Sequence, residues 1–235
     1  MQTKPEKLEV SVAEEIKTKE VSPGTPAKVA QKNEEKLPLA EVEKRQKIMT
    51  EYARLLARYV EPHNKKSRWV KNEDLPRLLA DGKDLVAMCN LPRGNYAGIA
   101  ALAHSQMDDK DPLRFFVMQK GMVIINPVIF LTTKTTVEKV EGCLSFEYNP
   151  LKKDVPRYNK ITVIYQTLER LNDKSEPTIS KPITEGFNGS AGHVFQHEIS
   201  HCNGSNIYDA DFKAESCHGL GFGLIDKEEV IKLYE

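Results

Sequence analysis

Two histidines and a glutamate lie within five positions of one another in the segment FQHEISHCNG, residues 195 to 204. His197 and His201 are four residues apart, so on a helix they project from the same face and can bind one metal ion. Glu198 would lie beside that ion as a group that accepts and donates protons. Two imidazoles do not complete a catalytic metal site, so a third ligand must come from elsewhere in the chain.

The third ligand is expected to be a cysteine, histidine, aspartate or glutamate. Cys143 is the preferred candidate, because it ends a strand pattern in VEGCLSF, where the preceding glycine permits close approach of the backbone. The alternative is that Cys143 is a small buried hydrophobic residue. Cys202 directly follows the second histidine and points about 100° away from it on a helix, so it is assigned to the core. Cys217, next to His218 in a glycine-rich segment, is the competing candidate.

The metal-binding pair is predicted to lie on a helix over residues 191–204, AGHVFQHEISHCNG, which Asn188 or Ser190 would cap and Gly204 would end. Before this helix come short runs that are rich in valine, isoleucine and phenylalanine and bounded by residues that break strands. These predicted strands are LRFFVM (113–118), GMVIINPVIFLTT (121–133) and KITVIYQT (160–167). A polar stretch separates the last of them from the helix.

Three further helices are predicted, at residues 40–62, 72–89 and 225–235. Strands followed by one central helix indicate an α+β fold, with antiparallel or mixed β-sheets around the helix that carries the HExxH motif. Residues 1–38 contain no aromatic residue and many charged ones, so they are predicted to form a disordered tail. Residues 39–235 would then form the single folded domain.

Composition excludes several classes of protein. The 235 residues include 34 basic and 34 acidic ones, so the net charge does not indicate a nucleic-acid or membrane partner. Four cysteines are too few for a disulfide scaffold in a chain of this length, which favours reduced thiols in an intracellular compartment. No apolar run is long enough to span a membrane, and the tail is too acidic for a typical mitochondrial presequence.

Three motifs together resemble those of peptide deformylases, and they occur in that family's order. They are the glutamine that ends AALAHSQ (100–106), the pentapeptide EGCLS (141–145) and QHEISHCNG (196–204). The resemblance covers roughly residues 70–207 and leaves the tail outside. It marks the chain as a divergent member, because parts of the first and third motifs differ from the family pattern.

The resemblance implies a role for each matching residue. One divalent metal ion, expected to be Fe(II) with Zn as a common substitute, would be bound by three side chains, those of Cys143, His197 and His201. Glu198 would be the general base and acid. Gln106 and the backbone N–H of Leu144 would polarise the formyl oxygen, while Glu141 and Gly142 would shape the segment around the cysteine.

The departures from the family pattern bear on activity and specificity. Ile99 and Ala101 stand where the family's first motif has two glycines, and Ala101 fits only if φ there is not positive. Ser200 replaces an aspartate of the family helix, which would weaken support of the metal if that aspartate acts on the ligands. His193 and His104 replace apolar or small residues. Each is either a satisfied core group or a determinant of substrate choice.

The residues and the resemblance indicate the same chemistry. Three protein ligands leave a fourth position for water, and a metal lowers the pKa of that water to about 7. Glu198 would move the proton from the water to the leaving amine, which is the hydrolysis of an amide. The resemblance alone specifies the substrate as the N-formyl group on the N-terminal methionine of nascent peptides. It also implies transient association with ribosomes, and a cytoplasmic protein in bacteria or an organellar one, mitochondrial or plastid, in eukaryotes.

Two alternatives remain at this level. A generic metallopeptidase would also contain HExxH, but its third ligand usually lies downstream of the helix rather than upstream. A catalytically impaired homologue could instead serve as a ribosome-associated or structural subunit. Retention of Glu198 argues against that role, because a structural metal site needs no general base.

Overall fold

The computed structural model describes five segments, residues 65–90, 99–146, 151–169, 175–218 and 227–234, together with positions 40, 43, 47 and 50. All of them belong to the unit Ala40–Glu235. The four isolated positions are helical, but most of the predicted helix at 40–62 and the whole predicted tail lie outside the described residues. None of the described helices is long and apolar enough to cross a membrane.

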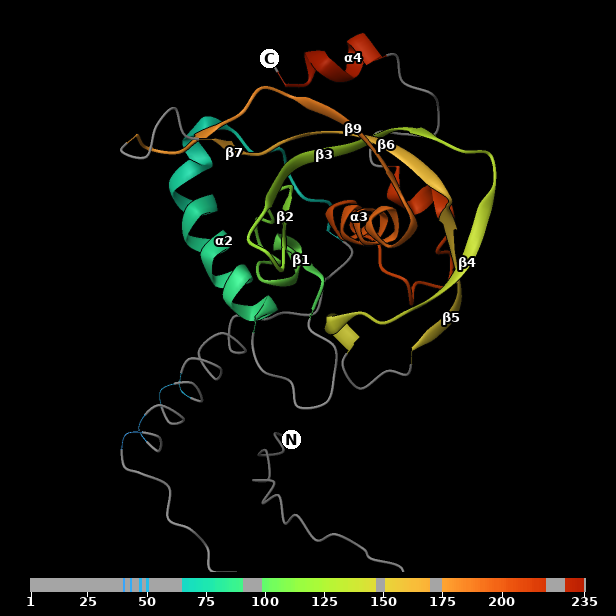
Figure 1. The fold of residues 1–235 in the computed structure, drawn as a ribbon, viewed down its shortest axis with the longest axis horizontal. Coiled ribbons are helices and arrows are strands. Elements are labelled where there is room, and N and C mark those ends of the chain that lie inside the picture. Colours follow the sequence, from blue (N-terminus) through green and yellow to red (C-terminus); the bar gives the residue numbers. More distant parts are fainter. Residues whose placement is uncertain are drawn as a thin grey trace, which may run out of the picture. The chain divides into compact units, whose positions relative to one another are not determined.

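The largest element is a five-stranded antiparallel sheet (Figure 1). In spatial order its strands are β1 (Ala101–Ala103), β2 (Phe115–Met118), β3 (Val123–Thr132), β6 (Lys160–Gln166) and β9 (Ile183–Asn188). The three predicted strands are confirmed as β2, β3 and β6. The two edge strands were not predicted. β1 is very short, and β9 lies in the polar stretch, with mostly exposed side chains.

Two smaller antiparallel pairs complete the described sheets. β4 (Thr136–Glu141) pairs with β5 (Lys152–Tyr158), and β7 (Leu168–Glu169) pairs with β8 (Thr178–Ile179). Short 3₁₀ turns connect the elements: η1 (Asn72–Asp74), η2 (His104–Gln106), η3 (Leu144–Phe146) and η4 (Ala214–Cys217). Two of these turns follow strands that lead toward the metal motif, η2 after β1 and η3 after β4.

The described helices confirm the predicted α+β class. They are α2 (Leu75–Cys89), α3 (Gly189–Cys202) and α4 (Lys227–Lys232). α2 and α4 lie within segments predicted to be helical, and α3 begins and ends two residues earlier than predicted. α3 lies beneath the large sheet, and α2 packs beside β1 and β2 (Figure 1). One core cluster joins Phe195, Ile199 and Cys202 of α3 to the sheet. Their spacing of four and three residues gives α3 a buried face away from the two histidines.

Glycines fix both the position and the end of α3. A Cβ on Gly192 would lie 3.3 Å from the backbone of Phe187, so a side chain there would push the helix away from β9. Gly204 has φ of 76°, and its N–H donates to the carbonyl of His201, which ends the helix as predicted. Asn188 occupies the N-cap position, but its side chain makes no capping hydrogen bond.

Candidate metal centre

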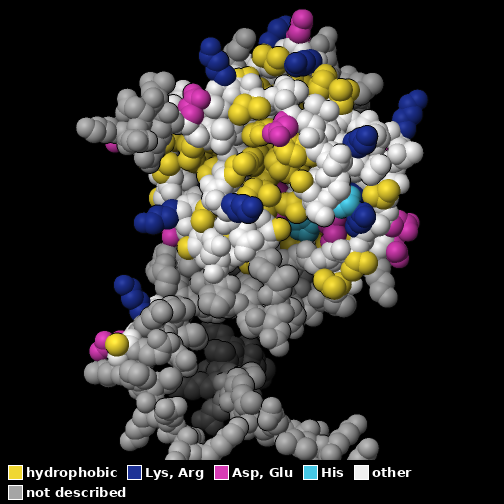
Figure 2. All heavy atoms as spheres, viewed as in Figure 1, with side chains coloured by type: hydrophobic (Ala, Val, Ile, Leu, Met, Phe, Trp, Pro, Cys, Tyr) yellow, Lys and Arg dark blue, Asp and Glu magenta, His cyan; other side chains and the backbone are white. Residues whose placement is uncertain are grey.

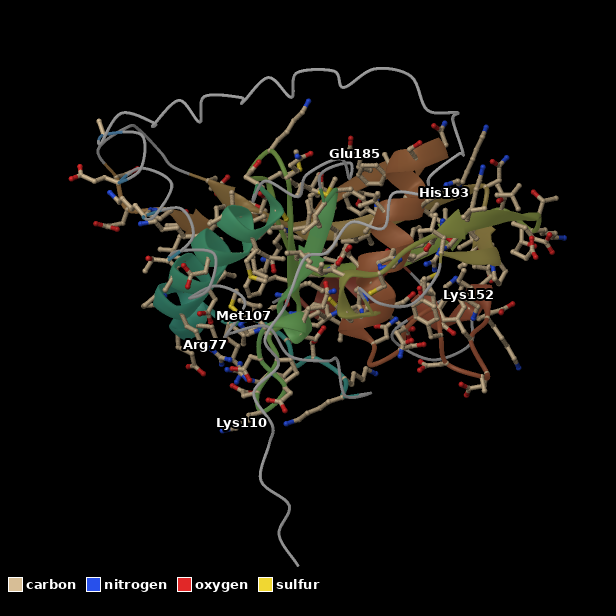
Figure 3. The ribbon with its side chains drawn as sticks, turned by 90° about the horizontal axis from the view of Figure 1, so that it is seen from below. Arg77, Met107, Lys110, Lys152, Glu185 and His193 are labelled. Carbon is tan, nitrogen blue, oxygen red and sulfur yellow. The ribbon has the colours of Figure 1, made fainter. Side chains whose placement is uncertain are left out.

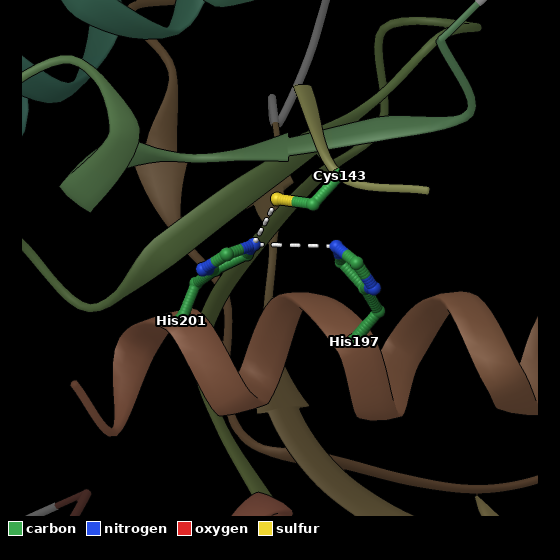
Figure 4. Close-up of side chains that lie close together, drawn as sticks. All are labelled: Cys143, His197 and His201. Carbon is green, nitrogen blue, oxygen red and sulfur yellow. Dashed lines mark hydrogen bonds between the residues drawn. The ribbon is translucent and has the colours of Figure 1, made fainter. Parts of the chain in front are cut away.

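The structure brings the side chains of Cys143, His197 and His201 together (Figure 4). The Sγ of Cys143 lies 3.2 Å from Nε2 of His201, which lies 3.2 Å from Nε2 of His197. The two histidines come from one face of α3, and Cys143 follows the end of β4. Residues that are more than fifty positions apart in the sequence thus meet at one point because β4 ends next to the helix that carries the motif.

These three groups fit one divalent metal ion. Their candidate ligand atoms all lie within 4.8 Å of one another. Ligands bonded to one zinc or iron ion at about 2.0–2.3 Å are separated by roughly 3–4 Å, which is close to the spacing here. One thiolate and two imidazoles suit Zn or Fe(II), and they leave a coordination position open. Within the described part of the chain, no other group of histidine, cysteine and acidic side chains meets the same criterion.

Glu141 orients one of the two imidazoles. Its Oε2 accepts a hydrogen bond of 2.9 Å from Nδ1 of His197. Nε2 of that ring is then left to face the other two candidate ligands, Cys143 and His201. Arg157 in turn donates to both oxygens of Glu141, at 2.8 and 2.6 Å. Burial raises the pKa of Glu141, but the hydrogen bonds from Arg157 and His197 outweigh it and lower the pKa to about 2.

The role of Arg157 was missed in the sequence. It is fully buried on β5, and its bidentate pair with Glu141 fixes the carboxylate that orients the ring of His197. From the sequence, Glu141 was expected only to shape the segment around Cys143. An arginine inside a strand pattern is a signal for a buried acidic partner, but the pairing of β4 with β5 was needed to identify which one.

The electrostatics of the cluster favour a thiolate. Burial raises the pKa of Cys143, but the adjacent His201 imidazole and hydrogen bonds with both histidines hold it well below 9.0. Burial of the His197 ring lowers its pKa, but its hydrogen bonds with Cys143 and Glu141 raise it to about 10. Without an ion, the cluster therefore holds its charges as a thiolate beside an imidazolium. A metal ion would take the place of the proton.

Glu198 lies next to the cluster but outside it. Only 4% of its surface is exposed, and its Oε2 is buried without a hydrogen-bond partner. Burial raises the pKa of this carboxyl group despite the nearby imidazoles of His197 and His201. A carboxyl group with a raised pKa and a free oxygen, beside three metal-binding side chains, is suited to proton transfer.

Gln106 reaches the same point from η2. Its Oε1 accepts a hydrogen bond of 2.9 Å from the N–H of Ala103, which fixes the orientation of the amide. Its Nε2 therefore faces the cluster, where it donates to the hydroxyl of Ser145 at 3.0 Å and lies 3.9 Å from the sulfur of Cys143. Leu144, the residue after Cys143, begins η3. The side-chain N–H of Gln106 thus lies beside the candidate metal position.

The competing thiols lie elsewhere. Cys202 and Cys217 are fully buried in the core cluster of the sheet and α3, as predicted for the first and contrary to the competing assignment for the second. His218 stacks on the ring of Tyr158, with ring centroids 5.2 Å apart. Neither cysteine belongs to the group that can bind a metal ion.

The departures in the motifs are accommodated in different ways. Ala101 lies within β1, and its φ is not positive, so an alanine can stand where the family has a glycine. Ser200 is buried, and its hydroxyl donates to the carbonyl of Gln196 in the same helix, which satisfies it locally. His104 is a satisfied core group: Nδ1 accepts from the N–H of Leu113 and Nε2 donates to Asp81. His193 differs, because its Nε2 is buried without a partner.

Comparison with known proteins places these features in one family. The family model for polypeptide deformylase matches residues 95–215, just over half of the chain. The peptide deformylase of Thermotoga petrophila is 38% identical over 99 residues, which is 41% of this chain and 53% of that protein. The enzyme of Pediococcus pentosaceus is 38% identical over 88 residues, 37% of this chain and 42% of its own length.

A solved structure of peptide deformylase from Thermotoga maritima also matches, with a TM-score of 0.48 and 31% identity, over 63% of this chain and 90% of that one. The chain spans about half the length of the curated relatives that it matches. The segment matched by the family model contains Gln106, Cys143 and the HExxH helix. On the strength of that match, the chain belongs to the peptide deformylase family.

Proposed function

We propose that this protein is a metal-dependent hydrolase that removes the formyl group from the N-terminal formyl-methionine of nascent peptides. The observation that carries the proposal is the arrangement of Cys143, His197 and His201 around one point, with the buried carboxyl group of Glu198 next to it and the amide of Gln106 facing it. Family membership supplies the reaction, and the geometry of this chain supports it. A structural metal site would need neither a buried carboxyl group with an unpaired oxygen nor an amide donor.

The three ligand side chains would hold one divalent ion, Fe(II) or Zn. When bound, that ion would act as a Lewis acid and lower the pKa of water, so that hydroxide is available at neutral pH. Glu141 and Arg157 keep His197 in the tautomer that presents Nε2. These residues therefore prepare the site before a substrate arrives, which reduces reorganisation during the reaction.

Glu198 carries the proton. It accepts a proton from the attacking water, whose oxygen forms a bond to the formyl carbon. The C–N bond then breaks, and Glu198 returns the proton to the departing α-amino group, so the products are formate and a peptide with a free N-terminus. The burial that raises the pKa of Glu198 makes its carboxylate a stronger base for the first step.

Gln106 and the backbone N–H of Leu144 would donate to the formyl oxygen as negative charge develops on it. The amide of Gln106 is already fixed by Ala103, so its Nε2 needs no reorientation. Removal of one such donor typically raises the barrier by about 3 kcal/mol. Because formylated peptides are substrates as they emerge from ribosomes, transient association with ribosomes is part of this proposal. So is a compartment in which translation starts with formyl-methionine.

The test combines metal content with formate release. The purified chain should contain one divalent ion, and it should release formate from formyl-Met-Ala-Ser but no acetate from acetyl-Met-Ala-Ser. Loss of the ion to a chelator should abolish release, and restoration of Fe(II) or Zn should recover it. A chain that binds the ion stoichiometrically and releases no formate from formylated peptides would contradict the proposed activity.

A further inference from the structure

Gln106 lies in a loop whose two ends are joined by a side chain. Residues 104–113, which we call the Gln106 loop, lie between β1 and β2. The ring of His104, which is completely buried, stands at the start of the loop, and its Nδ1 accepts a hydrogen bond of 2.9 Å from the N–H of Leu113 at the end. Within the loop, Oδ1 of Asp108 accepts from two backbone N–H groups, at 2.8 and 3.0 Å. The loop is therefore closed by one hydrogen bond and stabilised inside by others.

The same ring joins the loop to α2. Because Nδ1 of His104 accepts a hydrogen bond, the ring proton lies on Nε2, which donates to Oδ2 of Asp81 at 3.1 Å. Asp81 is buried and forms an ion pair of 3.4 Å with Arg77, one turn earlier on α2. The ring also stacks on Phe115 of β2, with ring centroids 4.8 Å apart. His104 is thus held by α2, by β2 and by the far end of its own loop.

Arg77 extends this connection along the loop. Its Nη2 and Nη1 donate to the carboxylates of Asp108 and Asp111, at 2.7 Å each. Figure 3 shows Arg77 of α2 beside Met107 and Lys110 of the loop. On the face that Figure 2 shows, by contrast, charged side chains are scattered among hydrophobic ones. The charged groups between α2 and the loop form one connected and partly buried network.

The network fixes the backbone from which Gln106 extends. His104 and Gln106 belong to the same 3₁₀ turn, in which the carbonyl of His104 accepts from the N–H of Met107 at 2.9 Å. The contacts of the Gln106 amide with Ala103 and Ser145 act at the end of the side chain and set its rotation. They leave the turn itself to be held by other groups. A displacement of about 1 Å in an active site can lower a rate by about 100-fold, so support of this turn bears on catalysis.

We propose that His104 is a positioning residue for the proposed deformylase reaction. Through its two hydrogen bonds it holds the Gln106 loop on α2, so that Nε2 of Gln106 stays directed at the candidate metal centre. Both ring nitrogens of His104 are taken up, by Leu113 and Asp81, so none is left for a substrate or a metal ion, and the residue acts through Gln106. A small residue, as in the family pattern at this position, would offer neither contact.

Three substitutions separate the two hydrogen bonds. His104→Ala removes both, His104→Asn keeps an acceptor near the place of Nδ1, and His104→Gln keeps a donor near the place of Nε2. With formyl-Met-Ala-Ser on the metal-loaded full chain, kcat should fall at least about tenfold in His104→Ala while KM changes less than about twofold, because Gln106 acts on charge that develops in the transition state. The other two variants should each recover part of the loss. An unchanged kcat in His104→Ala would overturn the inference.

The decisive comparison repeats the change in a chain that lacks the amide. If His104 acts through Gln106, His104→Ala should lower kcat less than about twofold when Gln106→Ala is already present. The same fold-change in both backgrounds would overturn the inference, because His104 would then stabilise the fold without a specific effect on Gln106.

Tyr165→Phe is the matched control. It removes a hydrogen bond of 2.7 Å from the Tyr165 hydroxyl to Glu185, between β6 and β9, at the opposite end of the large sheet from β1. This variant should keep the wild-type kcat. An equal fall in Tyr165→Phe and His104→Ala would show that the position of the lost hydrogen bond does not matter, and it would overturn the inference as well.

The side-chain amide of Gln106 gives a readout that does not depend on hydrolysis. NMR relaxation of this group in the zinc-loaded chain should show a rigid amide in the wild type and in Tyr165→Phe, and a mobile one in His104→Ala, at equal zinc content. An equally rigid amide in the wild type and His104→Ala would overturn the inference. The inference rests on the proposed activity, but a wild-type chain that releases no formate would contradict that activity alone, and the amide would then decide whether His104 positions Gln106.

Discussion

His201 and Cys202 are neighbours at the end of α3, yet they face two polar regions that are built on opposite principles. His201 faces the candidate metal centre. The carbonyl of Cys202 instead accepts a hydrogen bond from the guanidinium of Arg114, a buried residue that directly precedes β2. Both regions bury charge beside the same helix turn. They differ in whether the charged groups at their centres have partners for all their polar atoms.

On the Arg114 side, each nitrogen of the guanidinium is paired. Nε and Nη2 donate to the carbonyl of Pro127 at 3.1 and 2.8 Å, and Nη1 donates to the carbonyl of Cys202 and to Oδ1 of Asn203. These acceptors include the end of α3, where the helix dipole favours a positive charge. Arg114 thus joins the last turn of α3 to β3 and leaves no polar atom of its guanidinium for a ligand.

On the His201 side, several buried atoms lack partners within the described structure: Nδ1 of His201, Oε2 of Glu198, Nη1 of Arg157 and Nε2 of His193. Folded proteins rarely leave such atoms unpaired, and the exceptions mark sites of ligand binding or chemistry. The comparison teaches that burial of polar groups does not by itself identify a site. A cluster of incompletely paired groups does, whereas single unpaired atoms also occur elsewhere in the described structure, at Oγ of Ser67 and Nε2 of His218. Each prediction below tests one side of this contrast.

The largest effect is expected from Cys143→Ser. A neutral hydroxyl is a far weaker ligand than a thiolate, so the variant should lose its metal ion and with it all formate release. Metal content by atomic spectroscopy on the purified chain measures this directly. Cys217→Ser is the control and should bind metal normally, because Cys217 lies in the core. The reverse outcome for the two variants would show that the coordination sphere is assigned wrongly.

Glu198→Gln should separate metal binding from catalysis. The amide keeps the shape and one acceptor oxygen of Glu198 but cannot take up the proton. Metal content and melting temperature should therefore remain, while formate release falls at least about 100-fold. Full activity in this variant would require a different base and would remove the main argument from the unpaired Oε2.

The contrast also explains what the sequence could predict. Val, Ile and Phe runs identified β2, β3 and β6, because these strands are buried on the sheet and carry the core. β4, β5 and β9 carry many polar residues, so no apolar run marks them, although β4 pairs with the next strand β5 and β9 pairs with β6. Spacing placed His197 and His201 on one face, and Cys143 was chosen by its local motif. The link from Arg157 through Glu141 to His197 required the three-dimensional structure, as did the complete pairing of Arg114.

Arg114→Met tests the paired side of the comparison. The substitution leaves the carbonyls of Pro127 and Cys202 buried without their donor, so we expect a loss of about 2 kcal/mol in the free energy of unfolding. In a chain of this size that corresponds to a fall of roughly 4–8 °C in Tm. Arg114→Lys keeps the charge but not the forked geometry, so its Tm should lie between those of the wild-type chain and Arg114→Met. An unchanged Tm would contradict the structural role of this cluster.

The smallest effect is spectroscopic and compares the thiols themselves. In the metal-free chain, burial raises the pKa of Cys143, but His201 and His197 together hold it well below 9.0, whereas burial raises the pKa of Cys202 and of Cys217 to about 12. The ultraviolet absorbance of thiolate should therefore be present at neutral pH and should be missing from Cys143→Ser. Cys202→Ala should keep it.

The two kinds of thiol make the stability of the folded chain change with pH in opposite directions. A thiol with a lowered folded pKa stabilises the folded chain fully above the unfolded value of 9.0, and this contribution is lost as the pH falls through the folded pKa. Cys202 and Cys217 stay protonated in the folded chain while the unfolded thiols ionise, so their contribution is lost as the pH rises from 9.0 to about 12. Denaturant unfolding of the metal-free chain across this range should thus show declining stability, with a shallower decline in Cys202→Ala. If Cys143 ionised together with the core thiols, the imidazoles would not be polarising it, and the two sides of α3 would not differ in the way proposed.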